Sequence, residues 1–389
     1  ICSNLNRGRG FVEILIALRL RKTTMSDAFE ILTPELTEEI LKHLAIPDLV
    51  RASLACRLFR KLILSPRFPC AAAPWFFLCG LHNISSRNHQ TFAFDPSSFS
   101  WFRLPSPPTA LDDVSVSDGF YFSTTHSSSF SFSPIFRPRW RSTSPLNFPR
   151  RNPLPTFISD SSIIVLAGAR FVGGLVDIED RLAVEIYDRD SRSWSLFPPL
   201  PIDFPFGYSS QTLASALHRD KLFVYGVYSF SISWFDQTAR NWGPVLTLRP
   251  PRAIFSFLIS CGDILILASM CTTPHRFVLW RLNEQTMELK EIAALPAEMA
   301  DFLVDSEQDD NKFASLKCVG TGGLVYVFNE DHYQSYAACL YDIASNIWRK
   351  VPPLPSPVNK FHKVLSFCSA VSPGDIIDDR RSAIFSEFP

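Results

Sequence analysis

The hydrophobic and polar positions of the chain follow one period over residues 29–68 and another from about residue 70 onward. In the first region apolar residues recur three and four positions apart, as at Leu36, Ile40 and Leu44. This spacing places them on one face of an α-helix. Beyond it, short apolar or alternating runs are broken by Pro, Gly, Ser and Asp, which is typical of many short β-strands. The pattern therefore predicts a small helical domain followed by a large all-β domain.

Three helices are expected in the first region. Thr33 can cap the first helix, with Pro34 in its opening turn. Pro47 opens the second helix, Phe59 lies on the apolar stripe of the third, and Pro66 stops it. Of the 34 residues from position 31 to position 64, 19 are apolar, more than a unit of about 40 residues can bury within itself. The surplus predicts a partner surface, or alternatively packing against the rest of the chain.

A repeat runs through the second region. In each repeat an apolar residue is followed directly by a turn residue, usually polar, and Trp or Leu stands six positions after that turn residue. The segment after the Trp or Leu, which we call the exit, is often rich in proline. The turn residues are at 95, 134, 188, 236, 283 and 342. We expect each unit to be held together by a pair of residues, and the clearest pairs are Asp95 with Trp101, Asp188 with Trp194, Asp236 with Trp242 and Asp342 with Trp348. Two weaker pairs are Pro134 with Trp140 and Asn283 with Leu289.

Each unit is interpreted as a hairpin in which the aspartate starts the turn and the tryptophan opens the outer strand. Proline at the exits suits an edge strand, because it cannot donate to a central ladder. Continuous apolar runs precede the turns and indicate inner strands buried between neighbouring sheets. They are Phe76–Cys79, Ile163–Ala167, Leu222–Tyr225, Ile264–Ala268 and Leu324–Phe328. A β-sandwich with coincidental tryptophan spacing is the alternative.

The order of residues in the helical region resembles the F-box, a pattern of Leu-Pro-x-Glu-Leu, Ile-Leu, Leu-Pro and a Leu-rich helix. It departs from that pattern by the inserted Thr33 and by Phe59 in place of a tryptophan. The resemblance covers about a tenth of the chain and implies docking on a Skp-type adaptor that binds a cullin. The residues that it assigns to adaptor binding are Leu32, Pro34, Leu36, Ile40, Leu41, Leu49, Cys56, Phe59 and Leu62.

The repeat resembles the kelch motif, whose blades recur at roughly 50 residues. It departs from kelch in ending its inner strands with single glycines, such as Gly80 and Gly226, and not with a Gly-Gly pair. The resemblance implies a degenerate, six-bladed β-propeller. The first blade lacks one strand, and the run Phe361–Cys368 has no repeat of its own, so we expect it to return to the first blade beside Trp75–Cys79. An F-box followed by such a propeller resembles the plant F-box/kelch proteins.

These patterns divide the chain into four parts. Residues 29–68 form the F-box, 70–375 the propeller and 376–389 a C-terminal tail. Residues 1–28 are expected to be a disordered leader or a non-native extension, because the first methionine is Met25.

Composition limits the possible functions. Lys+Arg and Asp+Glu are each 38, and a zero net charge argues against a generic nucleic-acid binder. Nine scattered cysteines without a CxxC pair indicate buried thiols in a reducing compartment, and no apolar run is long enough to span a membrane. We therefore expect a cytoplasmic or nuclear protein.

The sequence has no motif of an enzyme or a metal site, such as HExxH, a P-loop or GxSxG, and no cofactor is expected. Two charge clusters read as exposed loops: Arg137, Arg139, Arg141, Arg150 and Arg151, which could receive an acidic target, and the acidic run from Glu298 to Asp310. The resemblance implies the substrate-recognition subunit of a Skp–cullin–F-box ubiquitin ligase, which holds an unknown target protein and is not itself catalytic. The alternatives are a non-degradative scaffold and a propeller that binds a small molecule.

Overall fold

The computed structural model describes residues 33–68, 72–82, 85–106, 114–124, 129–150, 153–159, 162–168, 171–172, 175–176, 182–188, 190–205, 213–272, 275–304, 315–330 and 336–377. No helix within these ranges is long and apolar enough to cross a bilayer. Packing divides the chain into a helical unit, residues 1–73 with 371–389, and a β unit, residues 74–370.

The helical unit begins as its caps predict. Thr33 accepts a hydrogen bond from the Leu36 N–H at 3.4 Å, and Pro34 occupies the first turn. The second helix starts at Ile46, one residue earlier than expected. The helices of this unit are α3 (Pro34–Leu41), α4 (Ile46–Ala55), α5 (Arg57–Ile63) and α7 (Pro373–Ile377).

The C-terminal helix α7 is part of this unit, although the sequence boundary at residue 375 cuts through it. Ser372 donates its backbone N–H and its hydroxyl to the Asp375 carboxylate, at 2.7 and 2.8 Å, which ties down the start of the helix. Ile377 is then buried in one apolar cluster with Leu49 of α4 and Phe59 of α5. Residues far from α3–α5 in sequence therefore complete the core of the helical unit.

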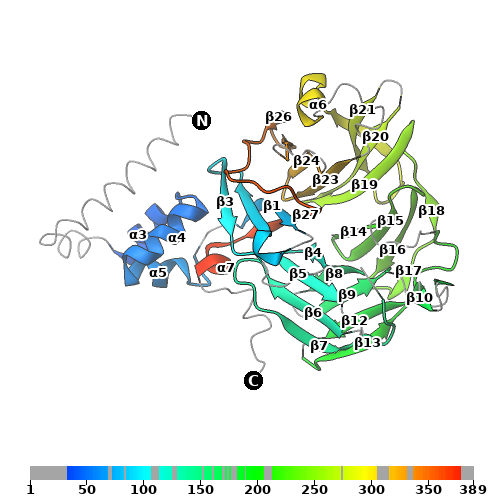
Figure 1. Cartoon of the computed structure of the whole chain (residues 1–389), viewed down its shortest axis with the longest axis horizontal. Helices are drawn as coiled ribbons and strands as arrows, with labels where there is room; N and C mark the ends of the chain where they lie inside the picture. Colours follow the sequence, from blue (N-terminus) through cyan, green and yellow to red (C-terminus); the bar gives the residue numbers. More distant parts are fainter. Residues whose placement is uncertain are drawn as a thin grey trace, which may run out of the picture. The chain divides into compact units, whose positions relative to one another are not determined.

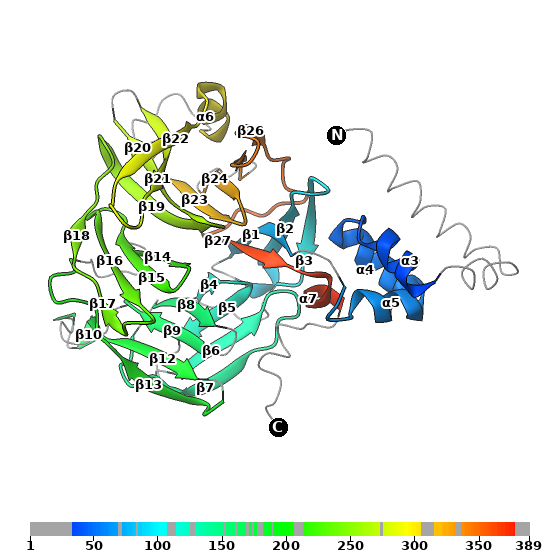
Figure 2. The ribbon, with the colours of Figure 1, turned by 180° about the vertical axis from the view of Figure 1, so that it is seen from behind.

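Apart from one two-stranded hairpin, the described strands of the β unit form six sheets around a central axis (Figures 1 and 2), which confirms the predicted six-bladed propeller. From the inner to the outer position the blades are β27 (Lys363–Val371), β1 (Ala73–Leu81), β2 (Gln90–Asp95), β3 (Ser100–Leu104); β4 (Val114–Ser117), β5 (Phe120–Thr124), β6 (Ser129–Pro134), β7 (Arg141–Pro145); β8 (Leu154–Ser159), β9 (Ser162–Leu166), β12 (Val184–Asp188), β13 (Ser193–Phe197); β14 (Leu213–His218), β15 (Lys221–Gly226), β16 (Ser231–Asp236), β17 (Asn241–Trp242) with β18 (Leu246–Thr247); β19 (Ala253–Cys261), β20 (Ile264–Cys271), β21 (Arg276–Leu282), β22 (Leu289–Ala294); and β23 (Leu316–Thr321), β24 (Leu324–Asn329), β25 (Ala338–Asp342), β26 (Ile347–Lys350).

Smaller elements lie between these strands. They are η1 (Ser86–Asn88), the hairpin of β10 (Phe171–Val172) and β11 (Leu175–Val176), and α6 (Ala297–Leu303). The first part of the acidic run, predicted as an exposed loop, is instead helix α6, although its acidic residues Glu298 and Asp301 are exposed as predicted. Met299 and Leu303 of α6 are buried against the fifth and sixth blades. The rest of the run, from Asp305, lies outside the described residues.

The ring closes as the sequence predicts. Strand β27 lies beside β1 at the inner position of the first blade, and the rings of Phe77 and Phe367 stack at 4.7 Å. The His362 N–H donates to the Leu81 carbonyl at 2.8 Å. A side chain at Gly80 would overlap the ring of Phe361, which explains the glycine at the end of β1. The C-terminal strand therefore completes the blade that the N-terminal strand begins.

The six-residue spacing of the repeat comes from one turn geometry. In five blades the turn starts at Asp or Asn, and the residue four positions later has a left-handed backbone. In the fourth blade, Asp236 accepts from the N–H groups of Thr238 and Ala239, both at 2.9 Å, and Arg240 has φ 55°. A turn of this length places Phe235 opposite Trp242. The same cross-strand pairing joins Phe94 to Trp101, Tyr187 to Trp194, Tyr341 to Trp348 and Leu282 to Leu289.

The second blade is the exception. Its turn starts at Pro134, which has no carboxylate to accept the turn's N–H groups, and Trp140 lies just before β7. Strand β7 instead begins with Arg141, which pairs with Phe132. The hairpin is present, but the predicted role of Trp140 as the first residue of the outer strand is not.

Candidate functional site

The residues assigned to adaptor binding separate into exposed and buried groups. Leu36 and Ile40 lie one turn apart on α3, with 53% and 37% of their surface exposed. Leu41, Leu49 and Phe59 are buried in the core of the helical unit, so their side chains stabilise it and present no free surface. Of the others, Pro34 is exposed, Cys56 and Leu62 are half-buried, and Leu32 lies outside the described residues.

Two exposed leucines were not assigned from the sequence. Leu54, near the end of α4, is 70% exposed, and Leu58, near the start of α5, is 36% exposed. Cys56, an extended residue, separates the two helices. Helical spacing alone could have suggested Leu54, because it falls outside the stripe that contains Leu49 and Ala52. We call Leu36, Ile40, Leu54 and Leu58 the apolar set of the helical unit.

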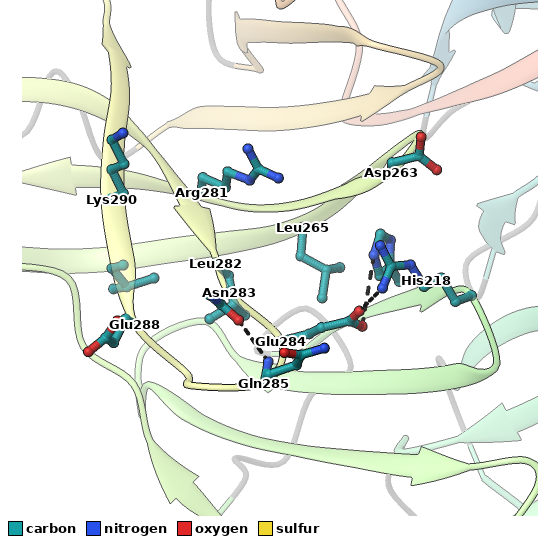
Figure 3. Close-up of a pocket in the computed structure, with 12 residues that line it drawn as sticks. His218, Asp263, Leu265, Arg281, Leu282, Asn283, Glu284, Gln285, Glu288 and Lys290 are labelled. Atoms are coloured by element: carbon teal, nitrogen blue, oxygen red, sulfur yellow. Dashed lines mark hydrogen bonds and ion pairs between the residues drawn. The ribbon is translucent and has the colours of Figure 1, made fainter.

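The propeller carries a second candidate, a pocket of about 480 Å³ at the turns of the fourth and fifth blades (Figure 3). His218 is the last residue of β14, Arg219 lies in the turn that follows it, and Asp263 lies in the turn after β19. The remaining lining residues belong to the β21–β22 hairpin and its neighbour β20: Leu265, Arg281, Leu282, Asn283, Glu284, Gln285, Glu288, Leu289 and Lys290. Three turns that are distant in sequence thus build one site.

Glu284 forms the polar end of this pocket. Its carboxylate pairs with the Arg219 guanidinium and lies 4.0 Å from Nε2 of the buried His218. Burial holds the pKa of His218 below its usual range, opposed in part by the Glu284 carboxylate. The imidazole is therefore neutral near pH 7.

The His218 ring also lies 3.3 Å from the Ser260 hydroxyl, through Nδ1. Serine, histidine and glutamate in this order resemble a hydrolase triad. However, Ser260 is not among the residues that line the pocket, and Glu284 is engaged by Arg219. This arrangement is a structural network, because it places no nucleophile in the cavity.

Other chemistry receives no support in the described part of the chain. No group of three or more His, Cys, Asp or Glu side chains there could hold a metal ion. The thiols of that part are free, and burial raises the pKa of Cys79 and of Cys261 to about 12, which makes both poor nucleophiles.

One member of the arginine cluster, Arg150, is not in the exposed loop that the sequence suggested. Arg150 is 6% exposed and pairs with the fully buried Glu185 at 3.0 Å. It also donates to the Ala183 carbonyl at 2.7 Å, and Glu185 accepts from the Asn147 N–H at 2.7 Å. The pair fastens the link between the second and third blades. Arg151 lies outside the described residues, and Arg137 and Arg139 are exposed beside the turn before β7.

Comparisons with known proteins found a matching family model, a related protein and similar solved structures. A family model described as the F-box domain matches residues 29–70. Over 120 residues the chain is 28% identical to an Arabidopsis thaliana protein named an F-box/kelch-repeat protein, an alignment that covers 29% of this chain. The chain spans about a third of that relative's length, 31%.

Similar solved structures include a Bacteroides fragilis protein whose name describes it as a 6-phosphogluconolactonase. The TM-score is 0.45 and the identity 10%, and the match covers 76% of this chain and 98% of that one. Another is YjhT, at TM-score 0.44 and 14% identity, covering 66% of this chain and 88% of that one.

Proposed function

We propose that this F-box/kelch-type protein is the substrate-recognition subunit of a Skp–cullin–F-box ubiquitin ligase. The helical unit would dock on a Skp-type adaptor and, through it, on a cullin. The propeller would hold the target protein. Other subunits would transfer ubiquitin, so the chain needs no nucleophile of its own. Such a subunit would work in the cytoplasm or nucleus.

The observation that carries this proposal is the apolar set of the helical unit. Four large apolar side chains stay exposed, although the unit has its own buried core and recruits Ile377 to complete it. Exposed large apolar side chains on a unit that already has its own core favour a protein partner. Since the unit also matches the F-box model, a Skp-type adaptor is the partner that fits.

The adaptor contact is tested by substituting Leu36→Asp and Ile40→Asp together in the full chain. Burying two such side chains contributes about 3 kcal/mol, so we expect adaptor affinity to fall by on the order of a hundredfold in a binding assay with purified adaptor. Both residues are exposed, so the fold should be unaffected. The matched control is Ile202→Asp, which changes an apolar side chain of the propeller that is 79% exposed. Undiminished adaptor binding by the double variant would exclude this surface.

The ligase role is separated from a non-degradative scaffold by a second experiment. Cullin should co-purify with the full chain, and proteins that co-purify with it when the proteasome is blocked should accumulate when the chain is depleted. A cullin-free complex, or targets whose levels do not change on depletion, would favour the scaffold. A small molecule that binds the propeller in the absence of any protein target would favour a small-molecule-binding propeller, the remaining alternative.

A further inference from the structure

The β21–β22 hairpin places two cations directly opposite each other. Arg281 and Lys290 are cross-strand partners, and both are exposed. Within the described part of the chain neither takes part in an ion pair or a hydrogen bond. Like charges at directly opposite positions destabilise a sheet. The hairpin therefore carries a repulsion that a bound anion would relieve.

The far end of the same hairpin shows the contrast. There Arg276 donates to the Glu291 carboxylate at 3.4 Å, so a cation of β21 has a counter-ion on β22. At the end that lines the pocket, the strands offer two cations and no counter-ion between them. The missing charge is thus confined to the pocket.

The acidic residues of the pocket do not supply a counter-ion for Arg281 and Lys290. Glu284 is engaged by Arg219 and lies beside His218, and Glu288 accepts from the Thr286 hydroxyl at 3.3 Å. Figure 3 shows Arg281 and Lys290 on the side of the pocket away from Glu284, with Asp263 apart from both. Leu265, Leu282 and Leu289 also line the pocket. Because side chains alternate along a strand, Leu282 and Leu289 point to the face of the sheet opposite to Arg281 and Lys290.

We propose that this pocket binds an acidic side chain of the target protein, a carboxylate or a phosphate, between Arg281 and Lys290. The planar guanidinium can hold two oxygens of either group, and the ammonium adds a second charge. Only the identity of the occupant as a ligase target depends on the function proposed above; the anion site itself does not.

The test uses the full chain and three fluorescein-labelled peptides of equal length, with Gly/Ser flanks, a leucine on each side of the centre and phosphoserine, glutamate or glutamine at the centre. Fluorescence anisotropy at low salt should show at least one acidic peptide binding about tenfold more tightly than the glutamine peptide. The phosphoserine and glutamate arms separate the two anions. Equal binding of all three peptides, or no binding of either acidic one, overturns the proposal.

The variant Arg281→Gln with Lys290→Gln should lose the preference, whereas Arg276→Gln, on the same hairpin, should keep it. Neutralising two opposed cations relieves repulsion, so the double variant should unfold at the same or a higher temperature than the natural chain. A preference that persists in the double variant overturns the site.

Adaptor binding is measured on the same proteins. If the natural chain binds the acidic peptide but no adaptor, the ligase proposal fails and the anion site stands. If it binds the adaptor but shows no acidic preference, the anion site fails and the ligase proposal stands.

Discussion

At the scale of single residues, the repeat tryptophans join neighbouring blades. Trp101 donates its indole N–H to the Pro352 carbonyl at 2.8 Å, and Trp242 donates to the Pro198 carbonyl at 2.8 Å. Each acceptor lies four residues beyond the tryptophan of the preceding blade. Trp348 has the same place in the sixth blade, but its buried indole N–H has no partner among the described residues. The preceding blade has a β-bulge beside Leu279 in the matching stretch, which changes the register there.

This difference predicts unequal costs for the same substitution. Trp101→Phe removes a made hydrogen bond and leaves a carbonyl unpaired, whereas Trp348→Phe removes a donor that was buried without a partner. The ring is reduced equally in both. We expect Trp101→Phe to lower the free energy of unfolding by about 1 kcal/mol more than Trp348→Phe does, measured by urea unfolding. Equal losses would show that the indole bond contributes nothing.

At the scale of elements, the helical unit depends on a helix from the other end of the chain. The fragment α3–α5 is too short to cover its own core, and α7 supplies Ile377 to the cluster around Leu49. Truncation after Ser372 would keep the whole of β27 but would remove all of α7.

We therefore expect Ile377→Ala to destabilise the helical unit by about 2 kcal/mol, since it leaves a cavity beside α4. Hydrogen exchange of the α4 amides should accelerate, while exchange in the propeller strands stays unchanged. Ile376→Ala is the control, because Ile376 is only half-buried. Unchanged protection of α4 in the Ile377 variant would mean that α7 does not stabilise the unit.

At the scale of the whole molecule, the propeller depends on a single long-range closure. Strand β27 covers the edge of β1, and the Gln90 side chain bonds the Pro357 carbonyl at 3.1 Å and the Asn359 N–H at 2.9 Å. Without β27, the first blade would expose a strand edge, and such edges promote aggregation. Closure also covers the ring of Phe77 with the ring of Phe367.

Truncation after Pro357 should therefore yield a protein that aggregates or is cut rapidly in limited proteolysis. Truncation after Ser372 keeps β27 and should leave the propeller monomeric and resistant, although the helical unit is weakened. The difference between the two proteins isolates the closing strand, because both lack α7. A monomeric, protease-resistant product that ends at Pro357 would contradict the closure.

The sequence by itself determined the features that depend on near neighbours. The turn at Asp236, its left-handed residue and the pairing of Phe235 with Trp242 all follow from a few consecutive positions. Because the same local solution recurs along the chain, the spacing predicted the blades. The one leftover apolar run, ending at Cys368, then predicted the closing strand.

Only the tertiary structure decided which side chains are buried and which lie together. The F-box resemblance assigned Leu36 and Leu41 to the same interface, yet one is exposed and the other is in the core, because burial depends on which faces of the short helices meet. The sequence suggested that Arg150 is a solvated charge, but in the fold it pairs with Glu185, which is 35 residues away in the chain. The pocket gathers three turns separated by tens of residues. Such contacts arise from the ring as a whole, and no local pattern of residues encodes them.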